Sequence, residues 1–100
     1  MATVSKQMFI GAATAVRSTL YTVPSSTTSV VTEIAVSNTE STASNFTIYL
    51  NGVLFSAFSP INAYSTVILD IKQALTTGQT IEAFASNSTI NFFISGVEIS

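Results

Sequence analysis

The stretch that decides the fold covers residues 20–38 and reads LYTVPSSTTSVVTEIAVSN. Its first part predicts a short strand through Tyr21 and Val23. Pro24 fixes its own φ angle and lacks an amide donor, so this strand must stop there or lie at a sheet edge. The four hydroxyl residues at positions 25–28 supply a turn. We therefore expect a strand, a turn and a second strand, which form the opening hairpin or a corner of a β domain.

The second strand of this stretch shows the period of two that a half-buried strand requires. One face is predicted to carry Val30, Thr32, Ile34 and Val36, and the other Val31, Glu33, Ala35 and Ser37. The polar segment 38–45 follows and contains no bulky side chain, so it is predicted to be a loop.

The remainder of the chain repeats this alternation. Asn51-Gly52 is the preferred pair for a type I′ hairpin turn, because both central residues of that turn need positive φ. Further strands are expected at 46–50, 53–55, 64–71, 81–85 and 90–99, with an irregular segment at 56–62 and a bend or single helical turn at 72–75. Gly96 is expected to break the last strand, where it can mark a bulge.

Short strands at intervals of about 8–12 residues, with turn signals between them and no helical stretch, indicate an all-β fold with a single antiparallel β-sandwich. We expect about seven to eight strands in an Ig-like or jelly-roll-like arrangement, with residues 20–100 as the sandwich domain. Residues 1–19 are expected to form an extended N-terminal arm or an edge strand, which pairs with this domain or with a neighbouring subunit.

Two further expectations concern this N-terminal segment. Because the compact pattern begins at Leu20, we expect removal of residues 1–17 to weaken assembly more than folding. The alternative is a short signal peptide that ends near Ala15, but Gly11 and Thr14 interrupt its apolar core, so the arm or edge strand is preferred.

Composition restricts the possible partners. Charged residues make up 8% of the 100 residues, against roughly 25% of an average chain, and hydrophobic residues reach 47%. With a net charge of −2 and only Lys6, Arg17 and Lys72 as cations, nucleic-acid binding is not expected. No apolar run approaches the ~20 residues that span a bilayer, so no membrane partner is expected either.

The sequence contains few of the residue types that an enzyme or a cofactor site requires. It contains no His, which removes the usual general base and the commonest metal ligand, and no Cys, which removes thiolate zinc sites and disulfides. A pair of carboxylates remains conceivable for glycoside hydrolysis, but each acid alternates with apolar neighbours and is interpreted as a solvent-facing strand residue. These acids are Glu33, Asp70, Glu82 and Glu98. We expect no catalytic activity, no cofactor and no metal, with no catalytic, cofactor-binding or metal-binding residue.

Aromatic residues suggest a second possibility, a sugar-stacking platform. The candidate rings are Tyr21, Tyr49, Tyr64, Phe55, Phe58 and Phe93. Most aromatic side chains on the strands of a small sandwich belong to the core or to an interface. A carbohydrate- or receptor-binding module that uses Tyr49 or Tyr64 is therefore kept as an alternative.

The apolar surplus is more informative. Large side chains occupy both faces of several predicted strands, in the neighbouring pairs Val31 and Ile34, Ile68 and Leu69, and Phe93 and Ile94. A two-layer sandwich buries only one face of each sheet, so the other face would expose apolar patches unless a partner covers them. We expect self-association or docking on a larger assembly.

Three segments resemble small bacteriophage virion proteins, β-sandwich accessory proteins of the head or tail. They are LYTVP (20–24) with its Ser/Thr turn and the strand ending VSNT (36–39), LTTGQTI (75–81) and ISGVEI (94–99). The resemblance implies a non-enzymatic structural role in the virion, with capsid decoration favoured and a tail or fibre subunit as the alternative. It implies a homo-oligomer whose partners are its own copies and other virion proteins, such as the major capsid or tail protein.

Overall fold

The protein, described at residues 2–100 by a computed structural model, consists of strands and turns. Met1, the first residue of the expected arm, lies outside this range. The strands are β1 (Thr3–Ala12), β2 (Ser18–Thr22), β3 (Thr28–Asn38), β4 (Ser44–Leu50), β5 (Val53–Ile61), β6 (Thr66–Thr76), β7 (Thr80–Ala85) and β8 (Ile90–Ile99). Residues 2–100 include no helix long and apolar enough to cross a membrane.

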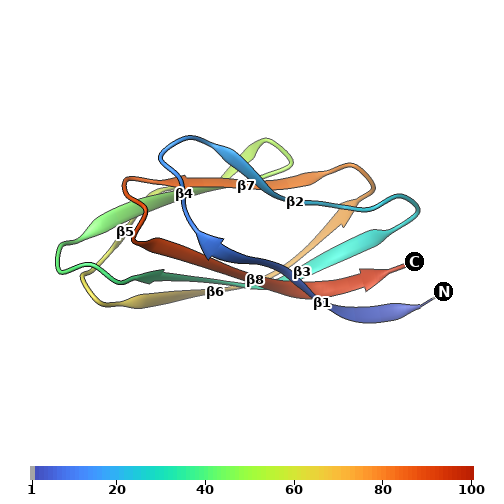
Figure 1. Ribbon diagram of the computed structural model, residues 1–100. Coiled ribbons are helices and arrows are strands. Elements are labelled where there is room, and N and C mark those ends of the chain that lie inside the picture. The colour runs from blue at the N-terminus through green and yellow to red at the C-terminus, as the bar shows by residue number, and fades with distance from the viewer. Residues whose placement is uncertain (1) are drawn as a thin grey trace.

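The strands form two four-stranded antiparallel sheets packed face to face, as Figure 1 shows. One sheet, here called sheet A, has the order β1-β8-β3-β6, and the other, sheet B, has the order β2-β7-β4-β5. The first strand pairs with the last, the second with the seventh, the third with the sixth and the fourth with the fifth. Successive pairs of this long folded hairpin alternate between the sheets, which is the jelly-roll arrangement. The prediction of an all-β antiparallel sandwich with about seven to eight strands is thereby confirmed, and residues 2–100 contain eight.

The stretch 20–38 forms a corner of the sandwich and not a hairpin. β2 belongs to sheet B and β3 to sheet A, so the chain crosses from one layer to the other between them. Pro24 ends the first strand as expected, and Ser26 adopts a positive φ of 54° in the crossing turn. Of the two predicted possibilities, the corner is the correct one.

The predicted faces of β3 are wrong at one point, because the strand contains a bulge. Val31 pairs with Gly96 and Glu33 pairs with Ser95, which leaves Thr32 as an extra residue. An extra residue shifts the alternation by one. Val31 therefore lies in the core together with Ile34, and Thr32 is exposed.

Gly96 does not break the last strand, which continues to Ile99. The extra residues lie on its neighbours: Thr32 on β3 stands beside Ser95–Gly96, and Met8 on β1 stands beside Ile94–Ser95. A Cβ on Gly96 would lie 2.2 Å from the carbonyl oxygen of Val30 and 2.5 Å from Cε of Met8. Glycine is required here because two bulged strands close in on β8.

The N-terminal segment is an edge strand of sheet A. β1 pairs with β8 from Thr3 to Ala12, and its bulged residue Met8 is buried in the core. The structure thus shows this segment paired with its own domain. The expectation that its removal weakens assembly more than folding rested on a compact pattern beginning at Leu20, and the burial of Met8 and Ala13 contradicts that premise.

The β4–β5 turn confirms the Asn51-Gly52 prediction, with φ values of 51° and 76°. Two other local predictions are wrong. The segment 56–62, expected to be irregular, continues β5 to Ile61 through bulges, and the segment 72–75, expected to be a bend or helical turn, belongs to β6. In both segments pairing with the neighbouring strand overrides the local signal.

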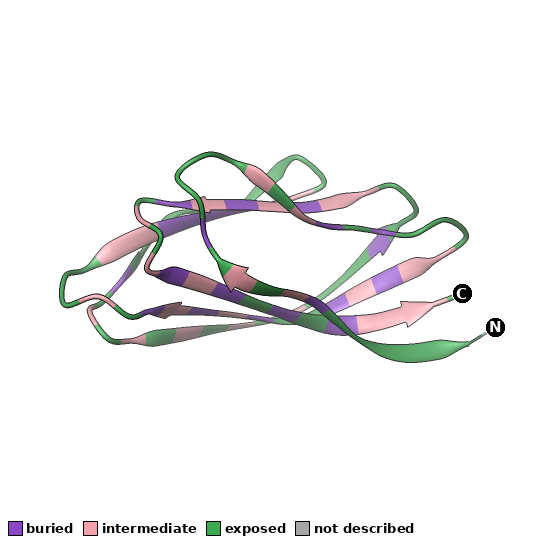
Figure 2. Cartoon of the chain, viewed as in Figure 1, coloured by how far each residue is buried: buried purple, intermediate pink, exposed green. Residues whose placement is uncertain are grey.

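The core lies between the sheets, and Figure 2 shows buried residues alternating with less buried ones along the inner strands. Phe46 of sheet B meets Phe92 of sheet A edge to face, with ring centroids 6.2 Å apart. Asn38, 2% exposed, donates from Nδ2 to the carbonyl oxygens of Thr42 and Asn62 and accepts the amide of Glu40. This buried amide ties together the loops at one end of the sandwich.

Candidate docking surfaces

A row of apolar side chains crosses the outer face of sheet A. Ile10 pairs with Phe93, Phe93 with Ala35, and Ala35 with Ile68, so the row extends from the edge strand β1 to the edge strand β6. Ile10 is 56% exposed, Ile68 59% and Phe93 38%. Directly paired side chains on one face lie about 4.5–5.5 Å apart at Cβ, so these four form a continuous strip. We call it the apolar row.

The next outward row of the same face is polar and contains two acids. Glu33 pairs with Asp70 across β3 and β6, and Ser95 and Gln7 continue the row on β8 and β1. Within residues 2–100 neither carboxylate takes part in an ion pair, although Lys72 lies two positions from Asp70. Like charges placed directly opposite each other on a sheet are unfavourable. This acidic pair therefore gives the face a local negative charge beside the apolar row.

The outer face of sheet B carries a group of three rings, here called the aromatic cluster. Phe84 of β7 lies between Tyr49 of β4 and Phe58 of β5, with centroid distances of 6.3 Å and 6.0 Å. The second pair is edge to face, a favourable geometry for aromatic rings. Phe58 is 65% exposed, so most of its surface faces solvent.

An arginine covers one side of the aromatic cluster. The Arg17 guanidinium carbon lies 3.7 Å from the centroid of the Tyr49 ring, and its Nε and Nη2 both donate to Oε1 of Glu82. A cation over an aromatic ring and an ion pair to a carboxylate hold this side chain in one position. The side chain of Arg17 nevertheless stays 43% exposed, which leaves a fixed cation beside exposed rings.

Phe58 is held outward by a strained backbone. Ala57 and Phe58 both stand opposite Thr47, so this part of β5 is a bulge, and Phe58 has a φ of 43°. Positive φ is unusual for a bulky residue and costs of order 1–3 kcal/mol. The fully buried Thr47 stabilises the conformation, since its Oγ1 accepts the Phe58 amide at 3.0 Å. Bulges at sheet edges commonly redirect a side chain, and this one presents Phe58 to solvent.

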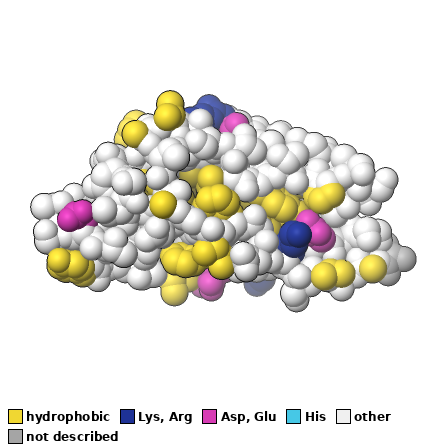
Figure 3. All heavy atoms as spheres, in the orientation of Figure 1, with side chains coloured by type: hydrophobic (Ala, Val, Ile, Leu, Met, Phe, Trp, Pro, Cys, Tyr) yellow, Lys and Arg dark blue, Asp and Glu magenta, His cyan; other side chains and the backbone are white. Residues whose placement is uncertain are grey.

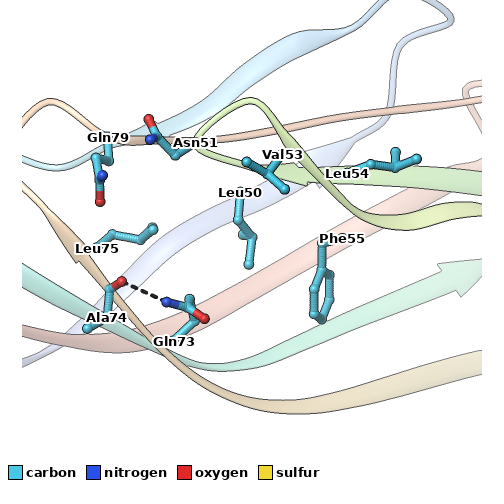
Figure 4. A pocket seen from close by; sticks show the side chains of 9 residues that line it. All are labelled: Leu50, Asn51, Val53, Leu54, Phe55, Gln73, Ala74, Leu75 and Gln79. Atoms are coloured by element: carbon cyan, nitrogen blue, oxygen red, sulfur yellow. Dashed lines mark hydrogen bonds between the residues drawn. The ribbon is translucent and has the colours of Figure 1, made fainter.

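A groove opens between the two sheets on the side of the edge strands β5 and β6. Its volume is about 410 Å³, and Figure 4 shows Leu50 and Phe55 pointing from sheet B into the space above β6. Gln73 on the opposite wall donates from Nε2 to the carbonyl oxygen of Ala74. This bond covers a main-chain acceptor of the edge strand, which lowers its tendency to pair with another chain.

The four acids considered as catalytic pairs occupy three different places. Glu33 and Asp70 are exposed on sheet A, as their interpretation as solvent-facing residues predicted, and Glu82 is bound by Arg17 on sheet B. Glu98 departs from this interpretation, because it pairs with the buried Ser29 and accepts a hydrogen bond from Tyr21. Residues 2–100 contain no group of three or more His, Cys, Asp or Glu that could hold a metal ion.

Tyr21 and Glu98 belong to a polar contact between the sheets. The Tyr21 hydroxyl, from sheet B, donates to Glu98 and lies 2.7 Å from Oγ of Ser29, both on sheet A. Burial raises the pKa of the Tyr21 hydroxyl, and the hydrogen bond to Glu98 raises it further. This contact links the two layers.

The six aromatic residues proposed as one sugar platform do not form one surface. Tyr21 is buried, Phe55 faces the groove, Phe93 lies on the outer face of sheet A, and Tyr64 is 74% exposed in the β5–β6 turn. Only Tyr49 and Phe58 come together. The sequence did not indicate that Phe84 and Arg17 would join them, because that grouping depends on the pairing of β4 with both β5 and β7 and on the course of the β1–β2 connection.

Comparisons with known proteins add no family. No family model matches the chain, and no curated protein matches it. Among solved structures, the chain is similar to the crystal structure of an exo-β-1,3-galactanase from Phanerochaete chrysosporium with galactose, at 17% identity and a TM-score of 0.46. The match covers 97% of this chain and 29% of the galactanase chain. A likeness at this level supports no conclusion about function.

Proposed function

We propose that this protein is a non-enzymatic structural protein of a bacteriophage particle, and specifically a decoration or accessory subunit of the capsid. The apolar row on sheet A is the observation that carries the proposal, together with the resemblance of the sequence to small virion proteins. Ile10, Phe93 and Ile68 form a strip that a monomer would leave in water, and burial of such side chains on a partner is favourable. The partners are copies of this chain and the major capsid or tail protein.

Scarcity of charge supports the same proposal. Of the three cations, Arg17 is paired with Glu82, so few positive charges remain to bind the phosphate groups of a nucleic acid or an anionic membrane. Figure 3 shows one side of the molecule, where hydrophobic side chains reach the surface in several groups with few charged ones between them. Such a surface suits dense packing against like subunits.

Electron microscopy of particles with and without this gene tests the proposal. The proposal expects a density of jelly-roll shape that is present on wild-type particles and missing from deletion particles. Its position on the head, the tail or a fibre decides between capsid decoration and the alternative of a tail or fibre subunit. If deletion particles retain every density of the wild type, the structural role is wrong.

A carbohydrate- or receptor-binding module is the second candidate. The aromatic cluster supports it, because Phe58 is exposed next to the fixed polar groups of Arg17 and Glu82, and binding sites for small molecules combine rings with a few placed polar groups. A glycan array probed with the purified protein and with Phe58→Ala tests this candidate. Binding that Phe58→Ala removes would support it, and an array without signal would exclude the glycans presented.

A further inference from the structure

The two outer faces of the sandwich differ in a way that suits them to each other. Sheet A presents the apolar row with an acidic pair beside it, and sheet B presents the aromatic cluster with the Arg17–Glu82 ion pair beside it. We propose that copies of this chain associate head to tail, with the apolar row of one copy packed on the aromatic cluster of the next. This inference rests on the proposed role as an assembly subunit and names the surfaces and the partner, a second copy.

Charge favours the head-to-tail contact over a contact between two A faces. Packing two A faces on each other would place four carboxylates, Glu33 and Asp70 from each copy, at one interface, with Lys72 as the nearest cation of the same face. Carboxylates left without partners at an interface carry a desolvation cost. In the head-to-tail contact, the two carboxylates of one copy meet the exposed side of the Arg17–Glu82 pair of the other, where the guanidinium keeps N–H donors that Glu82 does not use.

The composition of the aromatic cluster matches that of an interface centre. Tyr and Arg are typical anchors of protein interfaces, and buried aromatic residues near the centre contribute most to binding. Phe58 is already fixed by its bulge and by the hydrogen bond to Thr47, so little conformational freedom is lost when a partner covers it. The strained conformation of Phe58 thus presents a preformed anchor to the partner.

The faces are large enough for a stable contact. The molecule extends 46 × 21 × 18 Å, so the broad side of each sheet is close to the area of about 800 Å² per partner in a standard interface. A head-to-tail contact leaves one free face of each kind on every copy. Repetition then produces a ring or an open chain, according to the rotation between neighbours.

Two charge insertions test the inference, one on each face. Phe93→Glu blocks the apolar row, and Phe58→Asp blocks the aromatic cluster at a position where aspartate tolerates positive φ. Ile68→Glu replaces Phe93→Glu if circular dichroism shows that the latter does not fold. Mass is measured by light scattering over a range of concentrations, for wild type, for each variant and for an equimolar mixture of the two variants.

The head-to-tail contact predicts a distinct pattern. Wild type exceeds the mass of a dimer as concentration rises, each variant alone stays monomeric, and the mixture forms a heterodimer and nothing larger. Each substitution raises the dissociation constant of the contact it touches about 30-fold or more, the equivalent of the ~2 kcal/mol of a central anchor.

Each other pattern overturns the inference in a recognisable way. If one variant still dimerises alone and the other does not, the contact joins identical faces, and if both variants associate like wild type, the contact lies elsewhere. If both variants and their mixture stay monomeric, the two faces do not bind each other. If wild type is monomeric at all concentrations and its copies do not touch through these faces on particles, the head-to-tail contact is wrong, while the structural role stands. If Phe58→Asp leaves association unchanged but removes glycan binding, the aromatic cluster is a saccharide site.

Discussion

Replacing Gly96 with alanine tests whether the bulges beside β8 determine the packing at the centre of sheet A. The new Cβ would lie 2.2 Å from the Val30 carbonyl oxygen, whereas real Cβ contacts stay above 3.0 Å, so β3 and β8 must separate by about 0.8 Å there. The Met8 side chain, 2.5 Å from the same Cβ, can rotate away, but the Val30 oxygen belongs to the backbone of a paired strand. The clash is therefore relieved only by a distortion of the β3–β8 ladder.

The expected cost lies at the upper end of the range for overpacking. Such substitutions typically cost about 1–3 kcal/mol, and the distorted ladder favours a value of about 3 kcal/mol for Gly96→Ala. With a urea m value of about 1–3 kcal/mol/M, the unfolding midpoint falls by roughly 1–3 M. Urea unfolding followed by circular dichroism measures this shift, and an unchanged m value shows that the native state is the one affected.

Gly11→Ala is the matched control, because it makes the same substitution within a strand of the same sheet. The three atoms nearest to its new Cβ belong to the Phe9 ring, a side chain that can turn aside. Its free energy of unfolding is expected to change by less than about 1 kcal/mol. If Gly96→Ala is no more destabilising than Gly11→Ala, the account of two bulges closing on a glycine is wrong.

Three further predictions concern stability. Because the folded-state pKa of Tyr21 is raised, its contribution to the free energy of unfolding is present below the unfolded pKa of about 10 and is lost as pH rises toward the folded pKa. In urea titrations above pH ~10, wild type should therefore lose more stability than Tyr21→Phe. Parallel curves of stability against pH would contradict this. Asn38→Ala removes three hydrogen bonds of a buried amide and should lower the free energy of unfolding by about 2–4 kcal/mol, measured by urea unfolding against the exposed control Ser41→Ala. Deletion of residues 2–12 removes an edge strand and the buried side chain of Met8, whose burial alone stabilises the fold by about 1.5–3 kcal/mol. The deletion should therefore lower the free energy of unfolding as well as weaken assembly, and an unchanged urea midpoint would refute this.

The fold class could be predicted from sequence because alternation and turn chemistry are local. The period of two along 20–38, the stop at Pro24 and the Asn51-Gly52 turn each depend on neighbouring residues alone. Which sheet a strand joins depends on partners far along the chain, such as β8 for β1, and no local pattern specifies them. The choice between a hairpin and a corner at Pro24 therefore needed the structure.

Bulges explain the errors at finer scale. One extra residue at Thr32 moves Val31 into the core, so Val31 and Ile34 are neighbours inside and do not indicate an apolar outer face. The bulge is recognisable only against the partner strand, where Gly96 accommodates it. The extension of β5 through its positive-φ residue Phe58 was missed for the same reason, because Thr47 of the neighbouring strand stabilises that conformation.

The assignment of Val31 to the core changes where the exposed apolar side chains are found. Once Val31 is assigned to the core, the exposed apolar side chains of the outer faces include the apolar row and Phe58, and a further group lies beside the groove at Val53, Leu54 and Phe55. A monomer gains nothing from a strained backbone that exposes Phe58, since the same bulge with glycine would cost less. Covering Phe58 and the apolar row with a partner, as the proposed head-to-tail contact does, would remove both exposed apolar surfaces from water.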